Sequence, residues 1–112
     1  MKTIELIKDL EIGTLTYSEN AQDKEVSQLY DGPFRKLVEV RLRNSAILSK
    51  HKASEPITVL CLSGNGVFRA GSELQDIQEL QAGTLITLGA SIEHEVVAEP
   101  DLHLIVTKFK NS

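Results

Sequence analysis

The sequence predicts an all-β fold, a sandwich or small barrel built from short strands. Short apolar runs are separated by turn sequences rich in glycine, proline, asparagine and serine, with a turn about every eight to twelve residues. Within residues 34–43, Val38, Val40 and Leu42 alternate with charged residues, which is typical of a strand that is buried on one face. These two observations define the expected fold class.

The N-terminal segment is ambiguous. In residues 3–12 the apolar side chains recur at helical spacing, but the same residues also suit a strand. We expect a short strand at residues 14–17 and a polar loop at 18–24.

The remainder predicts strands joined by tight turns. Residues 26–30 and 34–43 are expected to form a hairpin around Asp31 and Gly32, because Asp-Gly is a strong hairpin turn sequence. Further strands are expected at residues 47–51, 57–62, 67–70, 74–80, 84–88, 92–98 and 102–109.

Two of the connecting sequences and one strand carry further expectations. Residues 63–66 and 99–101 contain glycine or proline and are interpreted as turns. Residues 57–62 are apolar on both faces apart from Thr58, which predicts a strand in the middle of the fold or at a subunit contact.

Composition and charge limit the classes of function. With 112 residues, the chain can build one modest core, so we expect a single domain over residues 1–112. A net charge of −4 argues against nucleic acid and anionic membranes as partners. We expect a cytoplasmic protein, because no signal sequence or membrane-spanning run is recognisable and the single cysteine cannot form an internal disulfide.

Two histidines fall on apolar faces of expected strands. A strand over residues 92–98 places His94 on one face with Ile92, Val96 and Ala98, while the carboxylates of this stretch take the other face. A strand over 47–51 places His51 on one face with Ile47, Ser49 and Ala53. Lys50 and Lys52 are then expected on the opposite face.

The stretch from Ser45 to Gly64 resembles the first motif of the cupins, in particular the small single-domain bacterial proteins with one conserved barrel domain (cupin type 2). That motif reads glycine, five residues, His-x-His, three or four residues, glutamate, six residues, glycine. Aligned on Gly64, the motif has its opening glycine at Ser45 and its first histidine at His51. The second histidine falls on Ala53 and the glutamate on Ile57.

The second cupin motif resembles the stretch that begins at Gly83. It reads glycine, five residues, Pro-x-Gly, two residues, histidine, three residues, asparagine. Gly89 stands at the proline and Ser91 at the second glycine, while His94 keeps the histidine and Ala98 replaces the asparagine.

The resemblance implies a double-stranded β-helix, or jelly-roll barrel, of the RmlC-like cupin type. Residues 34–109 would form the conserved barrel and residues 1–33 variable N-terminal strands. In metal-binding cupins, three histidines and a glutamate hold iron, manganese, nickel or zinc. Only His51 and His94 remain at those positions, and catalytic metal sites ordinarily need at least three protein ligands. The resemblance therefore implies a degenerate site with a weakly held divalent metal (Zn, Ni, Mn or Fe) or none.

Two classes of function remain open. The first is a binding module that holds a small molecule or a weakly bound divalent metal through His51 and His94, with Ser49 beside them. The second is a metal-dependent cupin enzyme of the dioxygenase, isomerase or decarboxylase type, with ligands that the sequence does not reveal and catalytic residues that it does not assign. A regulatory sensor domain is a third idea, which the short chain and its acidity disfavour.

The pocket itself is expected to be mostly apolar, with Ile47, Ile92 and Val96 near the histidines. His51 and His94 are expected to face each other across one end of the barrel. Burial and mutual repulsion would keep both imidazoles largely neutral at neutral pH.

Other residues receive plainer interpretations. His103 lies outside both motifs and is expected at the surface or an interface. Cys61 is expected to be a buried small hydrophobic residue, and Glu39, Arg41 and Arg43 to form a solvated strand face.

A homodimer is the expected assembly. Residues 57–62 and 102–106 carry more apolar surface than one small sandwich can cover, and the segment around Ile4 and Leu10 is expected to pack on the partner.

Overall fold

The computed structural model describes residues 3–12 and 22–111, which contain seven strands and no helix. The described residues therefore include no helix that could span a membrane. All strand pairs are antiparallel, and the predicted all-β class is confirmed. The strands are β1 (Lys24–Gly32), β2 (Arg35–Leu42), β3 (Ile47–His51), β4 (Ile57–Ala70), β5 (Asp76–Leu80), β6 (Leu85–Leu88) and β7 (His94–Phe109).

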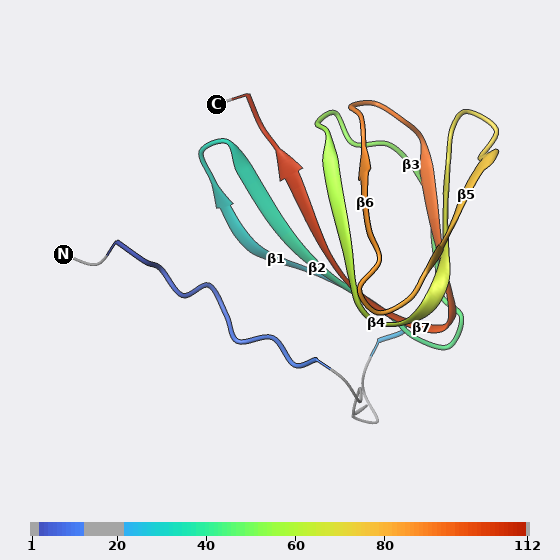
Figure 1. Cartoon of the computed structure of the whole chain (residues 1–112), viewed down its shortest axis with the longest axis horizontal. Coiled ribbons are helices and arrows are strands. Elements are labelled where there is room, and N and C mark those ends of the chain that lie inside the picture. Colours follow the sequence, from blue (N-terminus) through green and yellow to red (C-terminus); the bar gives the residue numbers. More distant parts are fainter. Residues whose placement is uncertain (1–2, 13–21, 112) are drawn as a thin grey trace.

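Two long strands, β4 and β7, organise the molecule. They pair along their whole length, from Ile57 opposite Lys108 at one end to Ala70 opposite His94 at the other. The register shifts twice near the middle of this ladder, and Figure 1 shows that both strands bend there, so that the sheet forms two walls of an open cup. Both ends of the β4–β7 ladder consequently lie at the open end of the cup.

The other strands extend the two walls. The first half of β4 and the second half of β7 form one wall with β1, β2 and β6, in the order β1-β2-β7-β4-β6. The remaining halves form the second wall with β3 and β5, in the order β3-β7-β4-β5. The buried apolar side chains are Val38, Val40, Leu42, Ile57, Val59, Cys61, Phe68, Ala70, Leu80, Val96, Ala98, Leu102 and Leu104.

The bend depends on glycine at close backbone approaches. Gly64 has a φ of +89°, and a Cβ at this position would lie 2.0 Å from the carbonyl oxygen of Asp101. A Cβ on Gly66 would lie 2.4 Å from the carbonyl oxygen of Val97. The predicted turns at 63–66 and 99–101 are therefore wrong, because both stretches belong to bent strands. A sharp bend within a strand uses the same residue types as a turn.

The β1–β2 hairpin turns two residues later than predicted. Asp31 and Gly32 are the last residues of β1 and pair with Lys36 and Arg35. The turn itself is Pro33-Phe34, and the φ of Phe34 is 69°. Proline followed by a residue with positive φ is the pattern of a type II turn, so proline overrides the Asp-Gly signal here.

The core matches the sequence pattern with one exception. Val38, Val40, Leu42 and Val96 are all buried as predicted. Ile92 was expected in the interior, but it is 37% exposed, because β7 begins only at His94 and the chain has not yet entered the strand.

The strand at 57–62 lies in the middle of the sheet, flanked by β6 and β7. Cys61 is fully buried there as predicted, and burial raises the pKa of its thiol. Leu102 and Leu104 are also buried. The expected excess of exposed apolar surface on residues 102–106 is therefore wrong at these two positions, since both side chains belong to the hydrophobic core.

The described N-terminal residues 3–12 form neither a helix nor a strand. Their apolar side chains, including Ile4, Leu6 and Ile12, are largely exposed. The strand expected at residues 14–17 lies outside the described residues.

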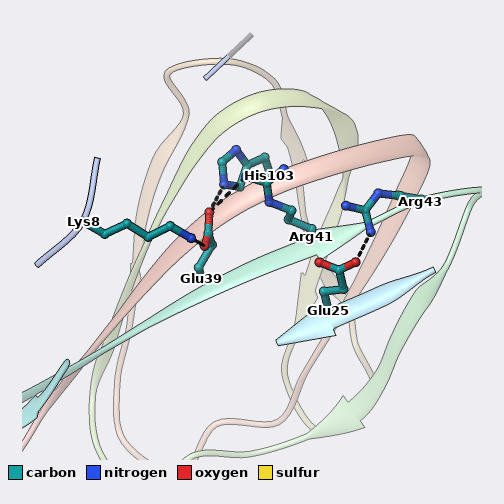
Figure 2. A network of polar contacts seen from close by, with 6 residues as sticks. All are labelled: Lys8, Glu25, Glu39, Arg41, Arg43 and His103. Atoms are coloured by element: carbon teal, nitrogen blue, oxygen red, sulfur yellow. Dashed lines mark hydrogen bonds and ion pairs between the residues drawn. The ribbon is translucent and has the colours of Figure 1, made fainter. Parts of the chain in front are cut away.

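A buried polar network covers the outer side of β2 (Figure 2). Glu39 is 4% exposed and His103 is 0% exposed, and the Nε2 of His103 lies 2.6 Å from a carboxylate oxygen of Glu39. Lys8 and Arg41 also contact this carboxylate, at 3.1 and 3.4 Å.

Two expectations about these residues are wrong. His103 is not a surface residue, because it is 0% exposed and pairs with Glu39, a carboxylate that Lys8 of the N-terminal segment also contacts. Glu39 and Arg43 do not form a solvated face either, since both are buried, and Arg43 contacts the carboxylate of Glu25 at 2.9 Å. Alternation alone could not reveal this, because both faces of β2 are covered.

Candidate functional site: a cavity between the two walls

A cavity of about 350 Å³ lies between the two walls of the cup. Its surface is mostly apolar and comes from strands of both walls, with Val38, Val40, Val59, Phe68, Leu104 and Val106 among its lining residues. This volume and make-up are typical of small-molecule sites.

The two predicted histidines meet at this cavity. His51 of β3 and His94 of β7 are directly paired across neighbouring strands, and their ring centroids are 4.2 Å apart with an angle of 61° between the rings. They are thus neighbours on the same wall, and the expectation that they face each other across the barrel is wrong. His94 is 4% exposed, whereas His51 is exposed, so the pair leads from the interior to the surface.

Each imidazole is oriented by its own strand. The Nδ1 of His51 lies 2.8 Å from the carbonyl oxygen of Ser49, and the Nδ1 of His94 lies 2.9 Å from that of Ile92. A carbonyl oxygen only accepts, so Nδ1 must carry the hydrogen in both rings. In its neutral form, each ring then has a free lone pair on Nε2, which suits a metal ion or a hydrogen-bond donor.

The environment of His94 favours its neutral form. Burial lowers the pKa of His94, and the charges of His51 and Lys108 lower it further, although the hydrogen bond to Ile92 opposes them. Phe68 stacks on the ring with centroids 5.4 Å apart. His94 therefore keeps its Nε2 lone pair at neutral pH.

A bulge in β3 determines which residues face the cavity. Leu48 pairs with Val96 and His51 pairs with His94, so β3 has one residue more between these positions than β7 has. The extra residue shifts the alternation, and Leu48 packs against the core while Ile47 is 43% exposed. The expectation that Ile47 lines the pocket is therefore wrong, whereas Ser49 does line the cavity as expected.

All four positions aligned with metal ligands line this one cavity. His51 and His94 are joined there by Ala53 and Ile57, which have no lone pair to donate. The described residues contain no group of three or more histidine, cysteine, aspartate or glutamate residues that could hold a metal. The site therefore does not fit a four-ligand metal centre, and the two imidazoles are the only metal-binding side chains at the four aligned positions.

The sequence interpretation missed three lysines. Lys24, Lys52 and Lys108 all line the cavity. Lys52 was expected on the opposite face of its strand, which is wrong because β3 ends at His51 and alternation no longer applies. The sequence pattern could have indicated Lys108 and Lys24, because residues two apart in a strand share a face. Lys108 is two residues from Val106, and Lys24 is two residues from Val26.

Comparisons with solved structures place the fold. A cupin superfamily protein from Desulfitobacterium hafniense is 11% identical, with a TM-score of 0.73 over 87% of this chain and 84% of that one. A conserved protein of unknown function from Streptococcus pyogenes is 14% identical, with a TM-score of 0.73 over 99% of both chains. A variant of oxalate decarboxylase from Bacillus subtilis is 18% identical, with a TM-score of 0.64 over 70% of this chain and 22% of that one.

No family model matches the sequence, and no curated protein matches it. The structural similarities nevertheless agree on one fold class, an all-β barrel of the double-stranded β-helix type. The chain has the RmlC-like cupin fold, so the resemblance seen in the sequence is confirmed at the level of the fold.

Proposed function

We propose that this protein is a binding module, a cupin barrel that holds a small molecule or a weakly bound divalent metal through His51 and His94. The main support is the pair of imidazoles, whose ring centroids are 4.2 Å apart beside a cavity of about 350 Å³. In each ring, Nδ1 is hydrogen-bonded to a backbone carbonyl oxygen and Nε2 is left free.

The orientation of the rings restricts what they bind. A neutral imidazole whose Nδ1–H is already used can only accept at Nε2. The partner is therefore a hydroxyl or amine donor of the ligand, or a divalent metal with other positions filled by water or ligand. A bound metal would supply Lewis-acid polarisation of a ligand oxygen. The chain's part is to hold the two nitrogens in place and to exclude water with the apolar walls.

Titration with Zn²⁺, followed by calorimetry, tests this proposal. We expect weak binding that is lost on dialysis, and a drop of more than about tenfold in affinity for His51→Ala or His94→Gln. Cys61→Ala is the matched control, because the thiol is a soft metal ligand that does not line the cavity, so its loss should leave the Zn²⁺ affinity unchanged. Binding should also weaken with acidification, because protons compete for the imidazole lone pairs.

Two outcomes would contradict the proposal. Unchanged Zn²⁺ affinity in both histidine variants would remove these residues from the site. Tight stoichiometric metal that survives dialysis would require a third protein ligand, and would favour the alternative of a metal-dependent cupin enzyme. That alternative has its own support, since the fold is shared with oxalate decarboxylase, a protein with Mn(II) centres.

A further inference from the structure

The cavity has an unusual charge for a chain of this composition. The sequence has 16 acidic and 12 basic residues, yet the charged groups that line the cavity are three lysines and no carboxylate. The electrostatic character of the cavity is therefore opposite to that of the whole molecule.

The cavity lysines also lack ion-pair partners. Lys24, Lys52 and Lys108 form no salt bridge with any described residue, whereas Lys50, on the strand that leads to Lys52, pairs with Glu93 at 2.8 Å. Lys52 acts on Glu93 only through longer-range attraction. Ammonium groups beside an apolar cavity without a counter-charge favour an anionic ligand.

Lys108 and Lys52 lie at the same end of the cup as the histidines. Lys108 and His94 mark the two ends of the folded β4–β7 ladder, which the bend brings to the open end (Figure 1). Both residues line the same cavity. Lys52 follows His51 directly in the chain. Lys52 and Lys108 thus lie at the mouth, whereas Lys24, which pairs with Leu42, lies at the level of the bend. Val40 and Val59 lie deeper along their strands than Lys108.

The volume sets the size of the ligand. A cavity of about 350 Å³ corresponds to roughly a dozen volumes of about 30 Å³, the share of one water molecule. A ligand of about ten non-hydrogen atoms would fill most of this space.

We infer that the cavity takes an amphipathic carboxylate, with its apolar body between the two walls and its carboxylate at the mouth beside Lys52 and Lys108. This inference goes beyond the proposed function, because it concerns the same cavity but a second set of residues, the lysines that line it. The lysines carry the charge recognition, because the Nε2 atoms of His51 and His94 are acceptors and do not bind a carboxylate unless they are protonated. Lys24, on the inner side of the edge strand β1, adds to the positive field of the cavity.

A pair of isosteric probes tests the charge requirement. Octanoate and octanamide each have about ten non-hydrogen atoms and differ in charge. With a chelator present and at about pH 8, where free imidazoles are neutral, calorimetry or NMR titration of the full chain should show octanoate binding about tenfold more tightly than octanamide. Added salt should reduce this difference.

The variants assign the effect to particular lysines. Lys52→Gln combined with Lys108→Gln should lower octanoate affinity to that of octanamide, while octanamide affinity stays unchanged. Lys50→Gln is the matched control, because Lys50 is ion-paired with Glu93 and does not line the cavity. It should leave both affinities unchanged.

Three results would overturn the inference, and they separate it from the proposed function. Equal affinity for the two probes would leave an apolar binding module without charge selection. A preference for octanoate that appears only below about pH 6.5 would assign the charge to protonated histidines. Failure of both probes to bind would exclude this ligand class, while the Zn²⁺ titration would still test the histidine pair independently.

Discussion

Replacing Glu39 with alanine should destabilise the fold severely. Glu39 is 4% exposed and His103 is 0% exposed, with 2.6 Å between the carboxylate oxygen and Nε2. The Nδ1 of His103 already has no hydrogen-bond partner among the described residues. Glu39→Ala would therefore leave both ring nitrogens unpaired in the interior. Removing one partner of a buried pair costs about 3–5 kcal/mol, a large fraction of the roughly 5–15 kcal/mol that stabilise a typical domain.

Urea unfolding followed by far-ultraviolet circular dichroism measures this cost, since the chain has no tryptophan. Lys8→Ala is the matched control, because Lys8 contacts the same carboxylate at 3.1 Å but is 48% exposed. Its loss should cost less than about 1 kcal/mol. The double variant Glu39→Leu/His103→Leu should recover much of the loss, because apolar replacement of a buried pair is often neutral. A Glu39→Ala cost no larger than that of Lys8→Ala would refute the reasoning.

The same pair predicts a pH dependence. Burial alone would raise the pKa of Glu39, but the hydrogen bonds and charges of His103 and Lys8 outweigh it and hold the pKa below the usual value of 4.5. The unfolded chain then takes up the proton more readily than the folded chain. The stabilisation from Glu39 is therefore complete above about pH 4.5 and is lost as the pH falls through the lower folded value. Glu39→Gln should flatten this part of the curve of stability against pH.

Two further predictions concern the bend and the assembly. Gly64→Ala should lower the free energy of unfolding by about 2–4 kcal/mol, because the new Cβ overlaps the Asp101 carbonyl and the backbone is strained. Gly83→Ala is the control in the same urea assay: Gly83 has a similar φ of +93° but nothing within 4 Å, so the loss should be only about 1 kcal/mol. Equal losses would contradict the close approach at Gly64. We also propose a homodimer through the exposed apolar residues of segment 3–12. Sedimentation at micromolar concentration should then give twice the protomer mass of 12.4 kDa, and the double variant Ile4→Asp/Leu6→Asp should give the protomer mass. A wild-type protein that sediments as a single protomer would count against this assembly.

The sequence predicted the fold well where one rule was enough. Alternation identified Val38, Val40 and Leu42 as core residues, and the motif spacing brought His51 and His94 to one cavity. Both results depend on the two-residue alternation of strands and on the number of residues between motif positions, and both can be read directly from the sequence.

The incorrect predictions concern residues whose surroundings depend on where a strand bulges or ends, or on contacts with other segments of the chain. The bulge in β3 turned Ile47 outward and Leu48 inward, and it exists only relative to the register of β7. Lys52 reaches the cavity because β3 has already ended. His103 is buried because Glu39 lies on the neighbouring strand and Lys8 approaches from a distant segment. None of these partners is visible from the residue's own neighbours in the chain.

The bent β4–β7 ladder has a consequence for the order of folding. Pairing of Ala70 with His94 closes a shorter loop than pairing of Ile57 with Lys108, and closing a longer loop costs more chain entropy. The ladder is therefore expected to zip from the histidine end, around the bend, toward Lys108. The complete binding cavity then exists only in the fully folded chain. A ligand that spans both walls would bind the native state alone and raise the midpoint of thermal unfolding, by an amount that continues to grow with the logarithm of ligand concentration above the Kd.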